Sequence, residues 1–304
     1  RDRSPSRGLG DVYKRQNYDS ANIIHSNGKF YLLVGTSTSN RDHFYIVDAK
    51  TLYYENSAVV GANLSGLTIL NEQYGLVTGD GIRRIDLKSL NNVRIKNERL
   101  LCFYNSIIYN GKVLSNDTYK DESKVKYYDV NELIAAKEGE APAVTELDII
   151  QKQKINFVLA KDGNVYTLES ADNGCNIVKI KNDFTLEKVF ANFQPAKGPY
   201  HSSPTIGMVA SETENIIYLV STDGAIFKYI LGDSDSLKAP FIAAESGVSI
   251  TAPLQLNQQS GELYVTYTEE RKDESKIVVY SKDGKVLHTV DCGESVPSQI
   301  LFNN

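Results

Sequence analysis

Histidine is the residue type in this sequence with the widest range of chemistry, because imidazole can bind a metal or move a proton near neutral pH. The chain has four histidines, and they are dispersed: His25, His43, His201 and His288. None of them stands in an HxH or HExxH pattern, the spacings that bring two imidazoles to one ion. We therefore expect ordinary strand or loop histidines, with no metal site and no bound cofactor.

A nucleophile beside a base is suggested at His201-Ser202-Ser203. Neighbouring residues of a strand point to opposite faces, so this order does not bring the imidazole to a hydroxyl. No G-x-S-x-G elbow accompanies the stretch, and the proline at 204 favours a plain extended segment. The cysteines are odd in number and form no CxxC pair, which indicates small buried apolar residues: Cys102, Cys175 and Cys292. The sequence therefore predicts that the protein is not an enzyme.

Two stretches rich in glycine and aspartate look like fragments of ligand-binding loops. Residues 232–236, Gly-Asp-Ser-Asp-Ser, lack the distant Glu and the central Gly of a calcium loop. Residues 79–81, Gly-Asp-Gly, are not followed by a helical pattern, so they do not form a phosphate cradle at a helix N-terminus. We interpret both stretches as turns between strands.

Composition excludes several classes of function. The 304-residue chain carries a formal net charge of -5, which argues against binding to the phosphate backbone of a nucleic acid. It contains no apolar run of the ~18 residues that a membrane-spanning helix needs. The 19 tyrosines, the absence of tryptophan and a hydrophobic content of 41% favour half-buried strands over helices.

Residues 1–16 differ in character from the rest of the chain. Five of them are basic and two are acidic, and they show no apolar period. One interpretation is a basic arm for an acidic partner. We favour the other, a non-native junction sequence, because the string looks like translated junctions at the ends of unrelated metagenomic reading frames. On that interpretation residues 17–304 form a single domain, and any export signal or lipid-anchor cysteine would lie upstream.

A repeated pattern of a turn followed by an apolar residue and tyrosine predicts the fold. It recurs at residues 27–31, 110–113, 162–166 and 215–218. Equivalent positions in the strand that follows are spaced 39 to 52 residues apart: Ile46, Ile85, Tyr127, Lys179, Lys228 and Val279. Such a period with about four short strands per unit is typical of propeller blades. Only residues 131–137 have a helical pattern, which we expect to be an insertion between two strands.

Six copies of the unit can be counted: residues 20–60, 62–98, 99–148, 150–195, 199–243 and 247–292. Residues 296–302 have the pattern of one more strand. Propellers commonly close by pairing strands from both chain ends in one blade, so a lone terminal strand implies partners near the other terminus. We therefore predict an all-β fold, a β-propeller of four-stranded antiparallel blades. The favoured form is a seven-bladed parent truncated at its N-terminal end, and a complete six-bladed propeller is the alternative.

Several stretches carry a family resemblance: residues 261–265 (GELYV), 276–285 (KIVVYSKDGK), 296–302 (VPSQILF), 156–166 (NFVLAKDGNVY), 46–49 and 51–52. They are similar to YncE-like (YVTN-type) propellers, and most of all to the uncharacterised surface branch of gut Bacteroidetes. The resemblance covers about residues 20–304 and consists of positions that maintain the fold. It implies an exported, often lipid-anchored protein at the extracellular face of the outer membrane or in the periplasm. It also implies an outer-membrane transporter as partner.

A binding site is expected on the long polar loops between the second and third strands of the blades, together with the connections between blades. These loops are residues 36–42, 115–123, 169–175 and 268–275. Long loops on a rigid scaffold are where binding residues concentrate. Their aromatic and charged side chains suit a sugar-like or ring-shaped ligand. The candidate ligand-binding residues are Arg41, His43, Tyr104, Tyr119, Lys154, Tyr200, His201, Glu269 and Arg271.

Three functions from different classes remain open. The first is a non-enzymatic surface protein that captures a small molecule or glycan for a transporter. The second is a protein-interaction scaffold, which would present a flat apolar patch. The third is a propeller enzyme of the lyase or lactonase type, which would need convergent carboxylates or histidines. The predicted first strands of the blades are mostly apolar, which argues against the third function.

Overall fold

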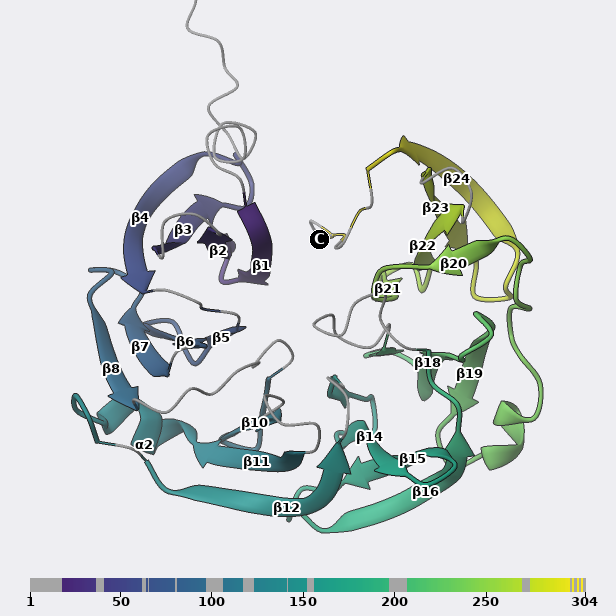
Figure 1. Cartoon of the computed structure of the whole chain (residues 1–304), viewed down its shortest axis with the longest axis horizontal. Coiled ribbons are helices and arrows are strands. Elements are labelled where there is room, and N and C mark those ends of the chain that lie inside the picture. The colour runs from purple at the N-terminus through teal and green to yellow at the C-terminus, as the bar shows by residue number, and fades with distance from the viewer. Residues whose placement is uncertain are drawn as a thin grey trace, which may run out of the picture. The chain divides into compact units, whose positions relative to one another are not determined.

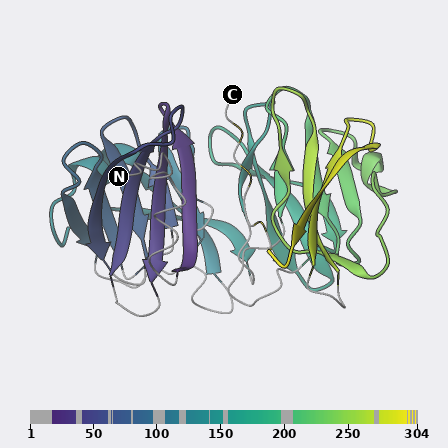
Figure 2. The ribbon, with the colours of Figure 1, turned by 90° about the horizontal axis from the view of Figure 1, so that it is seen from above.

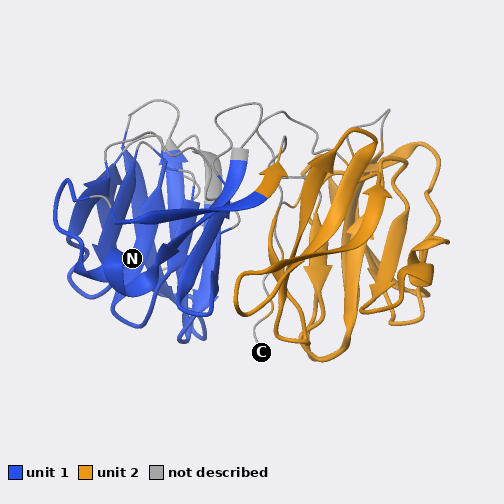
Figure 3. Ribbon diagram, turned by 90° about the horizontal axis from the view of Figure 1, so that it is seen from below, with its two compact units in different colours: residues 1–148, 303 blue, residues 149–302, 304 orange. Residues whose placement is uncertain are grey.

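The computed structural model describes residues 18–36, 41–61, 64, 66–79, 81–96, 106–116, 123–140, 142–151, 156–196, 207–269, 274–295, 297, 300 and 302. The chain divides into two compact units, residues 1–148 with 303 and residues 149–302 with 304 (Figure 3). Each unit contains three antiparallel sheets, numbered here as blades 1 to 6 in chain order. The six-bladed β-propeller is therefore the arrangement found among the described residues.

Blades 1 to 3 lie in unit 1 apart from residues 149–151, and their strands follow one another in chain order within each sheet (Figures 1 and 2). Blade 1 consists of β1 (Tyr18–Ser26), β2 (Lys29–Thr36), β3 (Asp42–Asp48) and β4 (Tyr54–Gly61). Blade 2 consists of β5 (Gly66–Ile69), β6 (Tyr74–Thr78), β7 (Ile82–Asp86) and β8 (Asn92–Lys96). Blade 3 consists of β9 (Ile107–Tyr109), β10 (Lys112–Asn116), β11 (Ser123–Asp129) and β12 (Val144–Gln151).

Blades 4 to 6 belong to unit 2. Blade 4 consists of β13 (Val158–Leu159), β14 (Val165–Ala171), β15 (Gly174–Ile180) and β16 (Leu186–Phe193). Among the described residues, blade 5 has three strands, β17 (Met208–Ala210), β18 (Ile216–Val220) and β19 (Ile226–Ile230), followed by the 3-10 helix η1 (Ser234–Leu237). In blade 6, β20 (Val248–Ile250) and β21 (Gln255–Leu256) both pair with β22 (Leu263–Glu269), which is followed by β23 (Ser275–Tyr280) and β24 (Val286–Gly293).

The repeats predicted from sequence match these sheets. Each of the six positions taken as equivalent lies in the third strand of its blade, from Ile46 in β3 to Val279 in β23. The helical insertion is also confirmed, as α2 (Val130–Ala135) connects β11 to β12. Its start is fixed by Asp129, whose carboxylate accepts hydrogen bonds from the backbone N–H groups of Asn131 and Glu132.

Neighbouring blades within a unit bury their apolar faces against each other. In unit 1, Tyr31 and Phe44 of blade 1 share a buried cluster with Val77 and Ile85 of blade 2. In unit 2, blades 4 and 5 share a second cluster, which includes Tyr166 and Tyr229 among its largest members. A single four-stranded sheet cannot cover both of its faces, so the packing of blade on blade provides the core.

One tight turn recurs three times in unit 2, over residues 160–164, 221–225 and 281–285. In each turn, the backbone N–H of the first residue donates to the carbonyl of the fifth residue. The fourth residue is a glycine, and its N–H donates to the carbonyl of the first residue. The glycines are Gly163, Gly224 and Gly284, with φ of 74°, 86° and 77°. Each follows an aspartate, so the same Asp-Gly pair closes hairpins in three blades.

A different turn, built on an aspartate, joins the third and fourth strands of blades 1 and 2. The Oδ1 atom of Asp86 accepts from the backbone N–H of Ser89 at 2.7 Å and from the Ser89 hydroxyl at 2.9 Å. In blade 1, Asp48 binds the N–H and hydroxyl of Thr51 at 2.7 Å each. The pattern Asp-x-Lys-Thr/Ser-Leu therefore encodes the turn in both blades.

Replacing Asp86 by alanine is expected to lower the free energy of unfolding by about 1 kcal/mol at pH 7. The backbone and side-chain bonds from Ser89 hold the pKa of Asp86 below its ordinary value. The contribution is thus present above the unfolded-state pKa of about 3.9 and is lost as the pH falls through the folded-state value. Denaturant unfolding of both proteins at pH 7 and pH 3 measures the difference, which should shrink at pH 3.

The matched control is Asp172→Ala, because Asp172 is an exposed turn residue with no side-chain hydrogen bond among the described residues. It should change stability by less than about 0.5 kcal/mol at either pH. An equal loss in both variants would mean that the turn does not depend on the Asp86 carboxylate.

Unit 2 also contains a chain of polar contacts that reaches from the end of β12 to blade 5. The buried Gln151 donates through Nε2 to Thr167 Oγ1 at 3.0 Å, and Thr167 Oγ1 donates to the Asn156 carbonyl at 3.1 Å. The Asn156 side chain then pairs with the backbone of Met208, donating to its carbonyl at 2.6 Å and accepting from its N–H at 3.1 Å. The Asn156 side chain therefore connects the first residue of β17 to the segment that precedes blade 4.

Two expectations about loops and termini need correction. Residues 169–175 are not a long loop, because β14 and β15 continue through the pair Ala171–Gly174 and leave a two-residue turn. Of residues 296–302, the described ones lie outside any strand; Thr266 donates to the Pro297 carbonyl at 3.4 Å, and the Phe302 ring packs on Tyr264 with centroids 5.0 Å apart. No helix in the described part of the chain has the length and apolarity to cross a bilayer.

Candidate functional site

Three of the ligand-binding residues predicted from sequence lie within the described residues. Arg41 is exposed just before β3, and His43 lies in β3, where its ring stacks on Tyr45 with centroids 5.8 Å apart. Glu269 ends β22 in unit 2 and is half-buried. The other six lie outside the described residues: Tyr104, Tyr119, Lys154, Tyr200, His201 and Arg271. The structure thus describes no site formed by the predicted set.

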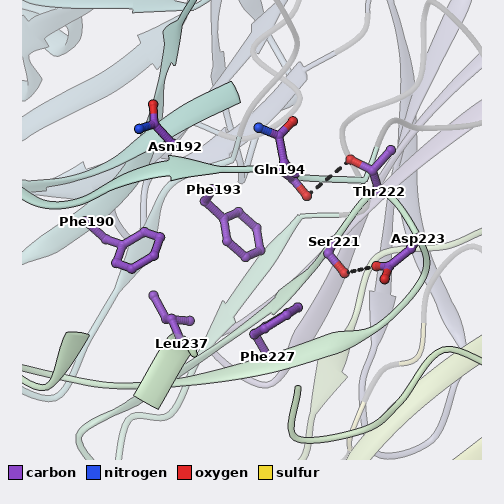
Figure 4. Close-up of a pocket in the computed structure, with 9 residues that line it drawn as sticks. All are labelled: Phe190, Asn192, Phe193, Gln194, Ser221, Thr222, Asp223, Phe227 and Leu237. Carbon is purple, nitrogen blue, oxygen red and sulfur yellow. Dashed lines mark hydrogen bonds between the residues drawn. The ribbon is translucent and has the colours of Figure 1, made fainter. Parts of the chain in front are cut away.

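A pocket in unit 2, lined by described residues, is a candidate site. It has a volume of about 410 Å³ and lies where the end of β16 meets β19, η1 and the turn between β18 and β19 (Figure 4). Small-molecule sites commonly have volumes of ~300–1,000 Å³. The lining residues are Phe190, Asn192, Phe193, Gln194, Ser221, Thr222, Asp223, Phe227 and Leu237. The pocket therefore lies where the end of blade 4 meets the tight turn between β18 and β19, which is not one of the long loops predicted from sequence.

One side of the pocket is apolar. Phe190 and Phe193 come from β16, Phe227 from β19 and Leu237 from η1 (Figure 4). The rings of Phe193 and Phe227 meet edge to face, with centroids 5.7 Å apart and planes at 88°. Phe190 and Phe227 are half-buried, while Phe193 and Leu237 belong to the core shared by blades 4 and 5. This side is an accessible extension of that core.

The other side of the pocket is polar and is held by backbone pairing. The Thr222 N–H donates to the Gln194 carbonyl at 2.9 Å, and the Ala196 N–H donates to the Val220 carbonyl at 2.8 Å. The Thr222 hydroxyl adds bonds to the carbonyls of Gln194 at 3.2 Å and Pro195 at 3.1 Å. These bonds fix the β18–β19 turn against the end of β16, so the polar edge has a defined position.

Asp223 supplies the one ionisable group among the nine lining residues. Its Oδ1 atom accepts a bond from the Ser221 hydroxyl and another from the Ala225 N–H at 3.3 Å. These bonds, with that of Ser221 the largest contributor, hold the pKa of Asp223 below its ordinary value. The pocket thus presents a carboxylate at neutral pH beside its aromatic rings.

The close approach of β16 to the β14–β15 turn depends on Gly174. Its φ is 120°, in the region that favours glycine. A β-carbon at this position would lie 2.6 Å from the Phe193 carbonyl oxygen and would overlap the Gln194 amide. Gln194 also donates through Nε2 to the Asn173 carbonyl at 2.6 Å. Gly174 therefore lets two lining residues reach their places.

Other reactive groups of unit 2 already have structural partners. Asp162 receives bonds from Lys179 at 2.8 Å and from the Tyr166 hydroxyl at 2.9 Å. Burial alone would raise the pKa of Asp162, but these bonds outweigh burial and hold it below its ordinary value. Burial raises the pKa of the Cys175 thiol to about 11, so this cysteine is a buried apolar residue as expected.

Cys292 differs from the expectation, because it is half-exposed, and Cys102 lies outside the described residues. Residues 232–236 form a turn and part of η1, with Asp233 capping its start, as the interpretation of a turn predicts. Within the described part of the chain, no three His, Cys, Asp or Glu side chains gather in an arrangement that could hold a metal ion.

Comparison with known proteins assigns the chain to a class and a family. By architecture it is a β-propeller. The chain belongs to the family described as a domain of unknown function, DUF5074, whose model matches residues 11–303. None of the curated proteins matches the sequence.

Solved structures support the architecture. A functionally unknown protein from Desulfotomaculum acetoxidans DSM 771 is similar with a TM-score of 0.57 at 11% identity, covering 93% of this chain and 88% of that one. A catalytically inactive virginiamycin B lyase from Staphylococcus aureus, solved with quinupristin, is similar with a TM-score of 0.55 at 14% identity. The match covers 95% of this chain and 90% of that one. A prolyl endopeptidase is similar with a TM-score of 0.54 at 11% identity, and the match covers 91% of this chain and 43% of that one. At these identities the likeness concerns the fold.

Proposed function

We propose that this protein is a non-enzymatic binding protein that captures a small molecule or glycan, and that the ligand enters the pocket between β16 and β19. The observation that supports this proposal is the pairing of accessible aromatic rings with a fixed polar edge in one cavity. Ligand sites are typically apolar cavities with a few placed polar groups. The rings can stack on the apolar face of a ring-shaped ligand, while the polar edge orients it.

Localisation and partner are proposed from the resemblance to YncE-like surface propellers of gut Bacteroidetes. On this proposal the protein is exported to the extracellular face of the outer membrane or to the periplasm, and it passes its ligand to an outer-membrane transporter. Fractionation of cells that express the full-length gene tests the proposal. Recovery in the cytoplasmic fraction alone would contradict it.

A thermal-shift screen of corrinoids, haem and oligosaccharides tests the binding function. A ligand present at 100 times its Kd should stabilise the folded protein by about 2.7 kcal/mol. Phe227→Ala removes one ring of the pocket and should abolish the ligand-induced shift. Phe241→Ala is the matched control, because Phe241 is a half-buried phenylalanine of unit 2 that packs on Tyr218 outside the pocket. A shift retained in Phe227→Ala would place the ligand elsewhere.

One observation favours a protein-interaction scaffold as a second candidate. The edge strand β24 exposes Val286, Leu287 and Val290, at 59%, 43% and 51%. Charged residues usually protect such an edge strand from pairing, and β24 contains a single Asp. A Val290→Lys variant that loses a partner captured by the wild type, while still showing the ligand-induced shift, would support this function.

A further inference from the structure

We propose that the pocket between β16 and β19 selects cationic ligands, specifically an apolar or aromatic group that carries an ammonium, over the corresponding anions. This inference rests on the proposed function, because it names the chemistry of the molecule that the pocket takes. Three features support it: the size and lining of the apolar side, the direction of the hydrogen bonds on the polar side, and the sign of the charge.

The apolar side is large enough for a ring and a short chain. A cavity of ~150 Å³ lined by apolar side chains already admits benzene, and this pocket measures about 410 Å³. Phe190, Phe193 and Phe227 provide three ring faces or edges around that volume (Figure 4). Phenylalanine rings attract apolar groups and also cations held over their faces.

The polar side offers mainly acceptors to a ligand, because the two hydroxyl donors and one N–H of the Gln194 amide are used within the protein. The Ser221 hydroxyl donates to Asp223, and the Thr222 hydroxyl donates to the carbonyls of Gln194 and Pro195. The Gln194 amide donates to the Asn173 carbonyl. What remains on the lining is the carboxylate of Asp223, the lone pairs of the two hydroxyls, and one N–H and the carbonyl oxygen of the Gln194 amide. A ligand that donates hydrogen bonds therefore fits this edge better than one that accepts them.

The negative charge of Asp223 also favours a cationic ligand. Asp223 is ionised at neutral pH, and the nine described lining residues include no Lys, Arg or His to pair with a ligand's carboxylate or phosphate. A unit charge about 4 Å from this exposed carboxylate changes affinity by about fivefold. The remaining polar residue of the lining, Asn192, has both a donor and an acceptor and favours neither sign.

Three probes of similar shape test the selectivity: 2-phenylethylamine, 2-phenylethanol and 3-phenylpropionate, titrated into the full chain at pH 7 and low salt. Ligand-detected NMR gives the three affinities. The amine should bind about fivefold more tightly than the alcohol, and the carboxylate should bind more weakly than the alcohol. In Asp223→Asn, which keeps the acceptor for Ser221, the amine should lose its advantage while the affinity for the alcohol stays within twofold.

Asp183→Asn is the matched control, because Asp183 is an exposed turn aspartate of unit 2 that does not line the pocket. It should preserve the preference for the amine. Equal affinities of the wild type for all three probes, or an unchanged preference in Asp223→Asn, would overturn the inference and leave the proposed function intact. Failure of all three probes to bind would show that the pocket takes no apolar group, and both proposals would fall.

Discussion

Gly174→Ala is expected to lower the free energy of unfolding by about 2–4 kcal/mol. Two effects add at this position. An alanine at a φ of 120° is strained, and its β-carbon would meet the Phe193 carbonyl oxygen at 2.6 Å. The end of β16 must then move away from the β14–β15 turn, which carries Phe193 and Gln194 out of the pocket. Chemical denaturation measures the loss of stability, and probe titration measures the accompanying loss of binding.

The matched control is Gly163→Ala, since Gly163 also has a positive φ, 74°, but a β-carbon there would meet nothing within 4 Å. This variant should cost about 1 kcal/mol from backbone strain alone and should bind the probes as the wild type does. The difference between the two variants isolates the steric contact. If they were equally stable, the close approach of β16 to Gly174 would not exist in solution.

Asn156→Leu is expected to cost about 2–4 kcal/mol, because it leaves both the N–H and the carbonyl of Met208 without the partners that Asn156 supplies. Asn156→Asp is the sharper variant. It keeps the acceptor for the Met208 N–H but sets a carboxylate oxygen against the Met208 carbonyl, where the amide donated at 2.6 Å. At pH 7 the loss should therefore approach that of the leucine variant.

Lowering the pH distinguishes the two Asn156 variants. The carboxyl group introduced by Asn156→Asp gains a proton and so regains a donor as the pH falls through its raised pKa, and the deficit of this variant relative to wild type should shrink. Asn156→Leu introduces no such group, and its deficit should stay constant. A deficit of Asn156→Asp that did not depend on pH would contradict the assigned pairing with Met208.

Much of the fold follows from local pattern, and blade 1 shows why. Asn27-Gly28 specifies a two-residue hairpin with positive φ at both residues, 51° and 70°. The apolar run at Phe30 then enters the core, and Asp48 closes the turn between β3 and β4 through Thr51. Each signal acts within a few residues, so each can be recognised without knowledge of the neighbouring blade.

The sequence also contains a hairpin signal inside a stretch whose polar composition favours a long loop. Asn173-Gly174 is a common hairpin pair, but the two-residue turn of the structure consists of Asp172 and Asn173, and Gly174 already pairs with Ala171 at the start of β15. The pocket could not be predicted in the same way. Phe193 and Phe227 lie in different blades, and their edge-to-face contact depends on how β16 approaches β19 rather than on any spacing along the chain.

The recurring Asp-Gly turn of unit 2 affects how homologous sequences should be read. Asp162, Asp223 and Asp283 occupy the same place in three hairpins, and one of them also faces the pocket. An invariant aspartate at 223 could therefore reflect backbone geometry, ligand charge or both. Position 222 is the better indicator, because the equivalent residues, Lys161 and Lys282, show that the turn tolerates a change there. Thr222 also bonds the carbonyls of Gln194 and Pro195, so its covariation with Phe227 across relatives would reflect ligand preference together with that contact, but not the geometry of the turn itself.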